Sequence, residues 1–437
     1  MVIKFIFIIF FVFSQNTELF EEYYKEAEKY MSNMTLEQKI GQLFFPRFND
    51  TTKESDINNK YPGGYVLFAY DFENKKEEDV INNIEYIQNL SKKATNLPLG
   101  LSVDEEGGKV NRISPTFRKE GGFPSPQQIY NESGIEGVLK IDKEKRDLLR
   151  KFKMNINLAP VADISYNSND YIYYRTLGKG PEETADYIKK DVESYEKDNF
   201  SCCNKHFPGY GNNIDTHGDI AIDNRPYEIF QKEDFKAFEA GISENIPMIL
   251  VSHNIVTCKD DKYPASLSKE WHNILRNELK FSGLILTDDL SMNAIKKYSG
   301  DLSPAILAVN AGNDILLTSQ YYEHLDAVKE AVYNKTISEE TINLACKRII
   351  AWKIKYLMNN EEKEKEKEKE KEQEQEQEQK QEQEQENKNE GNDHTALIIC
   401  LTIVGIIVIG IIFYFISKFF LCKNKSDEDI EKLIVNQ

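Results

Sequence analysis

The 437-residue sequence lacks three features that would indicate common classes of protein. It has no excess of basic residues: 73 acidic residues stand against 55 basic ones, a formal charge of −18, which argues against a nucleic-acid-binding surface. It is poor in cysteine, with six in the whole chain, too few for a disulfide framework. No GxGxxG fingerprint follows its first apolar strand-like segment, which argues against a dinucleotide-binding fold.

What the sequence does contain is enough apolar material for a core, distributed unevenly. Hydrophobic residues make up 40% and aromatic residues 11% of the chain, so the chain as a whole is a folding sequence. Residues 361–393 are the exception, because they have no apolar residue to bury and carry 15 acidic and 7 basic side chains. This composition predicts a solvated stalk that acts as a spacer.

Two apolar segments near the ends predict targeting to a membrane system. Lys4 precedes the apolar run Phe5–Phe13, which is too short to span a bilayer and is typical of a signal peptide over residues 1–15. A buried N-terminal strand is the alternative. The second segment, residues 396–421, has no charge from Ala396 to Ile416 and is long enough to cross a hydrocarbon core of about 30 Å.

The lysines that follow the second segment predict its orientation. Lys418, Lys423 and Lys425 place the positive side at the C-terminus, so the sequence predicts a single-pass type I membrane protein with a cytosolic tail, residues 422–437. Six N-x-S/T sequons lie in the part predicted to be outside or lumenal and would permit glycosylation. They are Asn33, Asn49, Asn89, Asn131, Asn199 and Asn334.

The tail also contains a candidate sorting motif. Asp429, Leu433 and Ile434 fit the acidic dileucine pattern D/E-x-x-x-L-L/I, which a sorting adaptor could bind through a basic patch and a shallow apolar pocket. An exposed tail without a fold can present both features. The predicted location is therefore the cell surface or an endosomal, lysosomal or digestive-vacuole membrane. The alternative is an amphipathic tail without a sorting role.

Eight short apolar runs, separated by amphipathic stretches such as residues 77–93 and 181–197, predict an α/β fold over residues 17–358. Such alternation is typical of a parallel sheet covered by helices, and eight units favour a (β/α)8 TIM-type barrel over an open sheet. The runs are Gly41–Phe48, Gly64–Tyr70, Leu99–Asp104, Ile156–Asp163, Ser201–Phe207, Met248–His253, Leu284–Asp288 and Asp314–Thr318. Polar residues follow several of them, at the end where such a barrel places its chemistry: Asp104, Asp163, Lys205, His206, His253 and Asp288.

The segment KHFPGYGNNIDTH carries one candidate site. Lys205 and His206 leave a strand, and a loop then leads to Asp215 and His217. A carboxylate two residues before a histidine can fix its tautomer and raise its pKa, which suits a general acid/base. A metal site built from His206, Asp215 and His217, or an incidental polar loop, remain open from this segment alone.

Two further segments place charged groups at strand ends. In LILTDDLSM, Asp288 comes directly off an apolar strand and could be a nucleophile or a metal ligand, while Asp289 could cap or brace the following helix. In SVDEEGGKVNRI, Asp104 is followed by a tight glycine turn and then by Arg112. That pair suits a polyhydroxylated substrate but could equally be a structural salt bridge.

Seven blocks of sequence together resemble the β-N-acetylhexosaminidases of glycoside hydrolase family 3, the NagZ-like group, over most of residues 35–355. The blocks are VDEEGGKVNR, NLAPVADI, YYRTLG, KHFPGYG with the downstream DTH, PASLS, LILTDDLSM and AGNDILL. The resemblance implies a retaining exo-glycosidase that releases terminal β-linked N-acetylglucosamine from glycans such as peptidoglycan or chitin fragments. It implies neither a metal nor a cofactor.

The same resemblance implies a role for individual residues. Asp288 would be the nucleophile that forms a covalent glycosyl-enzyme, and His217 the general acid/base with Asp215 as its partner, where most glycosidases use a second carboxylate. The implied sugar-binding residues are Asp104, Arg112, Arg175, Lys205 and His206. The chain departs from the family pattern at Tyr210, usually His, and at Thr216, usually Ser, and we expect these changes to alter loop packing.

Two alternatives are weighed against this hypothesis. A family 3 β-glucosidase or β-xylosidase usually carries a second α/β domain after the barrel, whereas here the stalk follows directly. A non-catalytic, membrane-displayed sugar-binding protein would have no need to keep Asp288, His217 and Asp215 together. Both alternatives are therefore disfavoured.

Overall fold

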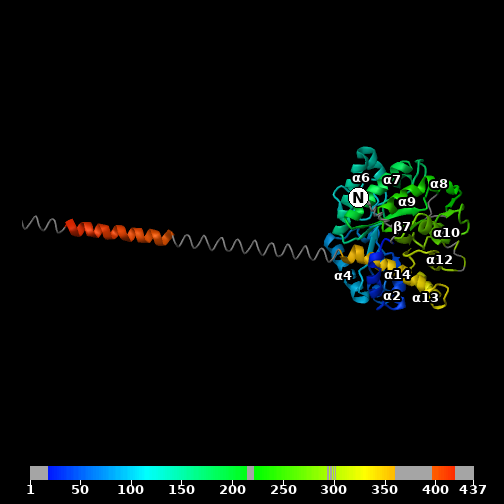
Figure 1. Cartoon of the computed structure of the whole chain (residues 1–437), viewed down its shortest axis with the longest axis horizontal. Helices are drawn as coiled ribbons and strands as arrows, with labels where there is room; N and C mark the ends of the chain where they lie inside the picture. The colour runs from blue at the N-terminus through cyan, green and yellow to red at the C-terminus, as the bar shows by residue number, and fades with distance from the viewer. Residues whose placement is uncertain are drawn as a thin grey trace, which may run out of the picture. The chain divides into compact units, whose positions relative to one another are not determined.

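The computed structural model describes residues 18–213, 221–292, 302–359 and 396–418, together with residues 295, 298 and 300. The chain divides into two compact units, Met1–Glu361 and Glu362–Gln437. The labelled helices and strands all belong to the first unit (Figure 1). The predicted signal peptide, stalk and cytosolic tail, with Asp429, Leu433 and Ile434, lie outside the described residues.

The described part of the second unit is a single helix, Ala396–Lys418. It has 23 residues and a mean hydropathy of 3.2. Among the described residues it is the one helix long and apolar enough to cross a membrane, judged by length and composition. Residues 419–421 of the predicted span lie beyond it, outside the described residues.

The first unit is an α/β fold in which each described strand pair is parallel. The strands are β1 (Phe44–Pro46), β2 (Gly64–Val66), β3 (Gly100–Val103), β4 (Ile156–Asn157), β5 (Ser201–Phe207), β6 (Ile222–Asp223), β7 (Met248–Val251), β8 (Ile255–Val256), β9 (Leu284–Thr287) and β10 (Leu316–Thr318). Six form one sheet in the order β2-β3-β4-β5-β7-β9, while β1 pairs with β10 and β6 with β8. Isolated parallel bridges also join Arg47 to Val66 and Leu286 to Ile315.

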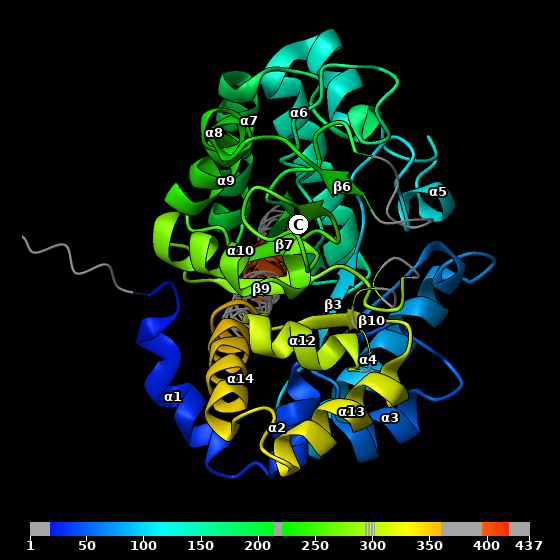
Figure 2. The same cartoon turned by 90° about the vertical axis from the view of Figure 1, so that its right-hand side faces the viewer.

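Helices connect consecutive strands and cover the sheet. They are α1 (Glu21–Met31), α2 (Leu36–Gln42), α3 (Lys53–Lys60), α4 (Glu77–Thr95), α5 (Ser114–Phe117), α6 (Pro126–Lys151), α7 (Pro181–Lys197), α8 (Tyr227–Lys232), α9 (Asp234–Ser243), α10 (Lys269–Asn273), α12 (Pro304–Ala311), α13 (Tyr321–Tyr333) and α14 (Glu339–Lys353). Figure 2 shows α6, α7, α9, α10, α12 and α14 lying around the strands.

Each of the eight predicted apolar runs contains a strand, and the predicted helix over 181–197 coincides with α7. The first run is wrong at its start, because Gly41 belongs to helix α2 and the strand begins at Phe44. A capping box fixes the start of that helix: the amide of Gln38 donates to the Thr35 hydroxyl and the amide of Thr35 donates to the Gln38 side chain. The helix then continues into the apolar run.

Both faces of the sheet are buried, which explains the continuous apolar character of its strands. Successive residues of β7 alternate between two clusters: Met248 and Leu250 pack in one, Ile249 and Val251 in the other. Period-two alternation of side chains across a strand produces this division. Adjacent Cys202 and Cys203 of β5 follow the same division, since both are buried, free thiols and they pack in different clusters.

Candidate active site

A pocket of about 380 Å³ lies at the C-terminal ends of the strands. Six of the predicted site residues line it: Asp104, Arg112, Arg175, Lys205, His206 and Asp288. Its other lining residues are Arg47, Val66, Phe68, Glu106, Val110, Leu158, Tyr171, Tyr210, Leu250, Asp289, Met292, Leu317, Thr318 and Ser319. The remaining two predicted residues, Asp215 and His217, lie outside the described residues.

Lys205 is the centre of the charged side of this pocket. Its ammonium group lies 2.6 Å from a carboxylate oxygen of Asp104 and 2.6 Å from one of Glu106. Burial alone would lower the pKa of Lys205, but the two carboxylates outweigh it and raise the pKa above its ordinary value. Lys205 is therefore positively charged. It is held at the end of β5, and its two carboxylate partners orient its N–H groups.

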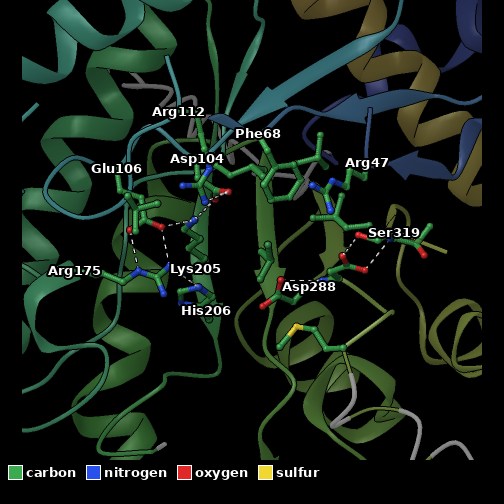
Figure 3. Close-up of a pocket in the computed structure, with 18 of the residues that line it drawn as sticks. Arg47, Phe68, Asp104, Glu106, Arg112, Arg175, Lys205, His206, Asp288 and Ser319 are labelled. Carbon is green, nitrogen blue, oxygen red and sulfur yellow. Dashed lines mark hydrogen bonds and ion pairs between the residues drawn. The ribbon is translucent and has the colours of Figure 1, made fainter. Parts of the chain in front are cut away.

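Glu106 is a buried member of this cluster to which the sequence analysis assigned no role. Arg175 binds it in a bidentate fashion, with nitrogen–oxygen distances of 2.7 and 2.9 Å. Burial would raise the pKa of Glu106, but Arg175 and Lys205 together hold it well below the ordinary range. The Arg175 guanidinium and the Lys205 ammonium thus share one carboxylate (Figure 3).

Glu105 stabilises the loop after β3, because its side chain accepts hydrogen bonds from backbone amides and does not line the pocket. Its carboxylate accepts hydrogen bonds from the amides of Arg112 and Ile113, each at 2.9 Å. The predicted tight turn is confirmed, because Gly107 has a φ of +99° that favours glycine. This turn brings the Arg112 guanidinium to 3.4 Å from Asp104, so the predicted pairing of these residues is observed.

His206 is fixed between two partners that define its tautomer. Its Nδ1 lies 2.6 Å from Asp163 Oδ2, and its Nε2 lies 3.2 Å from Nη2 of Arg175. Because a guanidinium can only donate, Nε2 must accept and Nδ1 must carry the proton donated to Asp163. His206 is therefore a neutral ring in this arrangement. Asp163, which the sequence placed at a strand end, orients it and also accepts the amide of Tyr210 at 2.7 Å.

Asp288 follows β9 and lines the pocket, as the sequence predicts. It accepts a hydrogen bond from the Asp289 amide at 2.8 Å. The side chain of Asp289 instead braces the neighbouring loop after β10, where it accepts the Ser319 amide at 3.0 Å and the Ser319 hydroxyl at 2.5 Å. The two adjacent carboxylates therefore have different environments, and Figure 3 shows Asp288 projecting into the same pocket as Lys205 and His206.

Arg225 anchors the chain on both sides of residues 214–220. It forms ion pairs with Asp223 at 2.8 Å and with Asp234 at 2.9 Å. Asp223 in turn accepts the side-chain amide of Asn213 at 2.9 Å. Burial raises the pKa of Asp234 to about 7, although Arg225 opposes this effect. This network holds the residues that flank the predicted acid/base segment.

Close packing in this network requires a glycine at position 209. Gly209 has a φ of +129°, and a Cβ atom there would lie 2.0 Å from Oδ1 of Asp234. Arg225 also donates to its carbonyl oxygen at 3.1 Å. The start of the loop that follows β5 is thus packed tightly against Asp234, the first residue of α9.

The described residues combine a carboxylate, Asp288, with a cluster of three cations and two carboxylates. Directed charged donors and acceptors of this kind bind a ligand rich in hydroxyl groups. Within the described part of the chain, no group of three or more His, Cys, Asp or Glu side chains is arranged to hold a metal ion. The carboxylate of Asp288, placed beside this cluster, is suited to nucleophilic or acid/base chemistry on a bound polyhydroxylated molecule.

The comparison with known families identifies a match over most of the chain. The model described as "Glycosyl hydrolase family 3 N terminal domain" matches residues 35–352. Proteins named beta-hexosaminidase are among the relatives: that of Nitrosomonas eutropha is 27% identical over 287 residues, covering 64% of this chain and 80% of its own length. That of Idiomarina loihiensis is 30% identical over 267 residues, covering 58% of this chain and 75% of its own.

A solved structure is also similar. It is that of a glycoside hydrolase family 3 beta-N-acetylglucosaminidase from Paenibacillus sp. str. FPU-7, with a TM-score of 0.69 and 28% sequence identity. The similarity covers 75% of this chain and 63% of that protein. The present chain thus corresponds to less than two thirds of that longer enzyme.

Proposed function

The chain belongs to glycosyl hydrolase family 3 and is a glycoside hydrolase, and from this premise we propose that it removes terminal β-linked N-acetylglucosamine from glycans such as peptidoglycan or chitin fragments. The relatives named beta-hexosaminidase and the Paenibacillus enzyme support this specificity. The observation that carries the proposal is one pocket that Asp288 lines together with Lys205, which is ion-paired to Asp104, and with His206.

In the proposed reaction, Asp288 attacks the anomeric carbon and forms a covalent glycosyl-enzyme. The bond from the anomeric carbon to the leaving oxygen breaks, and that oxygen takes a proton from His217, which Asp215 orients. His217 then takes a proton from water, which attacks the anomeric carbon and releases Asp288. Two displacements at one carbon give net retention of configuration.

The ion-paired cluster would hold the sugar in place during both steps. Lys205, Arg112 and Arg175 offer donors, and Asp104 offers an acceptor, to the sugar hydroxyl groups. Their mutual ion pairs keep these side chains in position before the substrate arrives, which reduces the ordering cost on binding. His206 is held in its orientation by its contacts with Asp163 and Arg175.

We extend the proposal to the architecture of residues 17–358, as a (β/α)8 barrel. The pairing of β1 with β10, and the bridges Arg47–Val66 and Leu286–Ile315, give each of the eight main strands a neighbour on both sides. This supports closure of the two sheets into one ring. A barrel of this type carries its site at the C-terminal ends of the strands.

The proposed enzyme is anchored as a type I membrane protein by the helix Ala396–Lys418 and its continuation to residue 421. Residues 1–15 would be the signal peptide, 361–393 the spacer and 422–437 the cytosolic tail. If Asp429, Leu433 and Ile434 form a sorting signal, replacing Leu433 and Ile434 with Ala should shift a tagged protein from vesicles to the plasma membrane. An unchanged distribution would exclude the signal.

The experiment that tests the function uses the full chain in detergent with aryl N-acetylglucosaminide and aryl glucoside. We expect hydrolysis of the first, in the presence of a chelator, with the β-anomer as the first product by NMR. Asp288→Asn should abolish turnover, whereas Asp289→Asn should mainly lower stability because it disturbs the Ser319 brace. Preference for the glucoside, or turnover by Asp288→Asn, would contradict the proposal.

A further inference from the structure

The wall of the pocket beside the ion-paired cluster carries a cation of a different kind. The guanidinium carbon of Arg47 lies 5.0 Å from the ring centre of Phe68 and 4.4 Å from that of Tyr70. The two rings are stacked, with centres 6.0 Å apart and planes 11° from parallel. The Nε of Arg47 also donates to the Tyr70 hydroxyl. Arg47 is therefore held in one place although it is exposed to solvent.

The backbone of Arg47 is fixed as well. Its amide donates to the carbonyl of Thr318 at 2.9 Å, and the residue forms a parallel bridge with Val66. Its side chain therefore starts from the rigid edge of the sheet and not from a long loop. Figure 3 shows Arg47 and Arg112 on either side of Phe68 at the same pocket.

Arg47 differs from the other cations that line the pocket because it forms no ion pair within the described part of the protein. The other three cations that line the pocket, Lys205, Arg112 and Arg175, each have a carboxylate partner. Arg47 has none within 4.0 Å among the described residues, and its two terminal nitrogens donate no hydrogen bond to any of them. Burial raises the pKa of Asp71 to about 6, and the charges of Lys75 and Arg47 oppose this effect, but Asp71 forms no ion pair with Arg47 and accepts the Phe68 amide at 2.8 Å.

A fixed guanidinium with both terminal nitrogens available matches an oxyanion in size and geometry. A planar fork of two N–H groups binds a carboxylate, sulfate or phosphate through two parallel hydrogen bonds, and these charge-assisted bonds are stronger than bonds between neutral groups. A neutral sugar would offer these two terminal nitrogens no charged partner. The aromatic rings attract the guanidinium through cation–π interactions, which restrict its motion without neutralising its charge.

We propose that Arg47 is a specificity-determining residue that binds an anionic substituent of the substrate, so the preferred glycan is acidic and not neutral. This inference deepens the proposed function and rests on it, since it concerns the substrate of the same pocket. The anion is either a carboxylate on the leaving sugar or a sulfate ester on the sugar that is cleaved off. The two sources share the oxyanion that Arg47 recognises, and they can be separated by experiment.

The test compares matched acidic and neutral substrates with the full chain in detergent. The first pair is N-acetylglucosamine β-linked to glucuronic acid and the methyl ester of the same disaccharide. The second pair is an aryl N-acetylglucosaminide with and without a 6-sulfate. Wild type should cleave the acidic member of one pair with a kcat/KM about tenfold higher than the neutral member, and the pair that responds identifies the position of the anion.

Variants assign that preference to one side chain. In Arg47→Gln the acidic-to-neutral ratio of kcat/KM should fall to near one, and in Arg47→Glu it should invert. The matched control is Arg118→Gln, because Arg118 also lies over an aromatic ring, 4.2 Å from the centre of Phe123, but does not line the pocket. This control should retain the wild-type ratio.

The outcomes separate this inference from the function on which it rests. A wild-type ratio near one for both pairs, or the same ratio in wild type and Arg47→Gln, would overturn the role of Arg47 and leave the glycosidase intact. If wild type hydrolyses none of the substrates, the proposed function fails. In that case calorimetry still decides the inference, by measuring the binding of the same disaccharide pair to Asp288→Asn and to the double variant with Arg47→Gln. The inference is supported only if Asp288→Asn binds the acid more tightly than the ester and the double variant loses this preference.

Discussion

Lys205 and Glu106 form an ion pair, with Nζ and Oε1 2.6 Å apart, in which each side chain is 2% exposed. Two opposite charges buried at this distance must stay paired, since either one left alone would be an uncompensated charge in a water-poor site. Arg175 and Asp104 extend the pair into a continuous cluster. The sugar-binding side of the pocket is therefore assembled before any substrate enters.

Replacing Glu106 with Gln tests this assembly. We expect the free energy of unfolding to fall by about 3–5 kcal/mol, because Arg175 loses its bidentate partner and the buried Lys205 loses one of its two. The KM of this variant should also rise. The control is Glu182→Gln, which removes an exposed ion pair with Lys236 and should cost less than about 1 kcal/mol. If chemical denaturation showed that both variants lose the same free energy of unfolding, the cluster around Glu106 would not be a buried unit.

Asp163→Asn tests the tautomer of His206. An amide in place of the carboxylate can donate to Nδ1, which would move the ring proton to Nε2, where it meets the donor Nη2 of Arg175. We expect kcat/KM to fall by about 10- to 100-fold with little change in secondary structure. Nitrogen NMR shifts of His206 would report the tautomer directly, and an unchanged Nδ1–H form in the variant would contradict this assignment.

The acid/base role proposed for His217 predicts a dependence on the leaving group. His217→Ala should lose most activity on disaccharides, whose leaving oxygen needs a proton, and least on activated aryl glycosides, which do not. Asp215→Asn should show the same pattern more weakly. The measurement is kcat/KM across a series of aryl glycosides of increasing leaving-group pKa, and a slope equal to that of wild type would remove the role.

Lys353 predicts how stability depends on pH. It is fully buried in α14, donates to Gln42 at 2.7 Å, and burial lowers its pKa to about 7, with Cys346 opposing this effect. Between about pH 7 and 10.5 the unfolded chain holds a proton that the folded chain lacks, so stability should rise by a few kcal/mol as the pH increases through this window.

Lys353→Met should remove that rise. The variant should be more stable than wild type near pH 7, with a difference that shrinks toward pH 10, measured by denaturant unfolding at several pH values. Lys347→Met, on the partly exposed side of the same helix, serves as the control and should keep the wild-type slope. A wild-type slope in Lys353→Met would show that another group carries the dependence.

The strands were predictable from the sequence because burial on both faces leaves continuous apolar runs with polar residues at their ends. The boundary at Gly41 was not, because α2 begins at the capping box of Thr35 and Gln38 and continues into the apolar run, and composition does not mark the residue at which it ends. The same limit applies to strand ends generally, which are set by pairing with neighbouring strands and not by composition.

The candidate site was partly predictable for a similar reason. The resemblance to the family selected Asp104, Arg112, Arg175, Lys205, His206 and Asp288, which line one pocket. Glu106 was missed, although its spacing of two from Asp104 at a strand end was a usable signal, since such residues share a side. Adjacent Glu105 shows why the letters alone are ambiguous: it binds backbone amides, including those of Arg112 and Ile113.

Arg47 could not have been selected from the sequence. Its placement depends on Phe68 and Tyr70, which lie just after β2, and on the absence of a carboxylate partner among the described residues, both of which are properties of packing. An arginine after an apolar run is otherwise an ordinary surface residue.

In the proposed mechanism, Asp288 becomes covalently bonded to the substrate sugar. The most direct measurement is mass spectrometry of peptides from the protein incubated with a slow fluorinated N-acetylglucosaminyl fluoride, which forms the glycosyl-enzyme faster than water releases it. We expect one added sugar on the peptide that contains Leu284–Met292, localised to Asp288 by fragmentation, and none in Asp288→Asn. A label on another residue, or steady turnover of the reagent without any adduct, would contradict it.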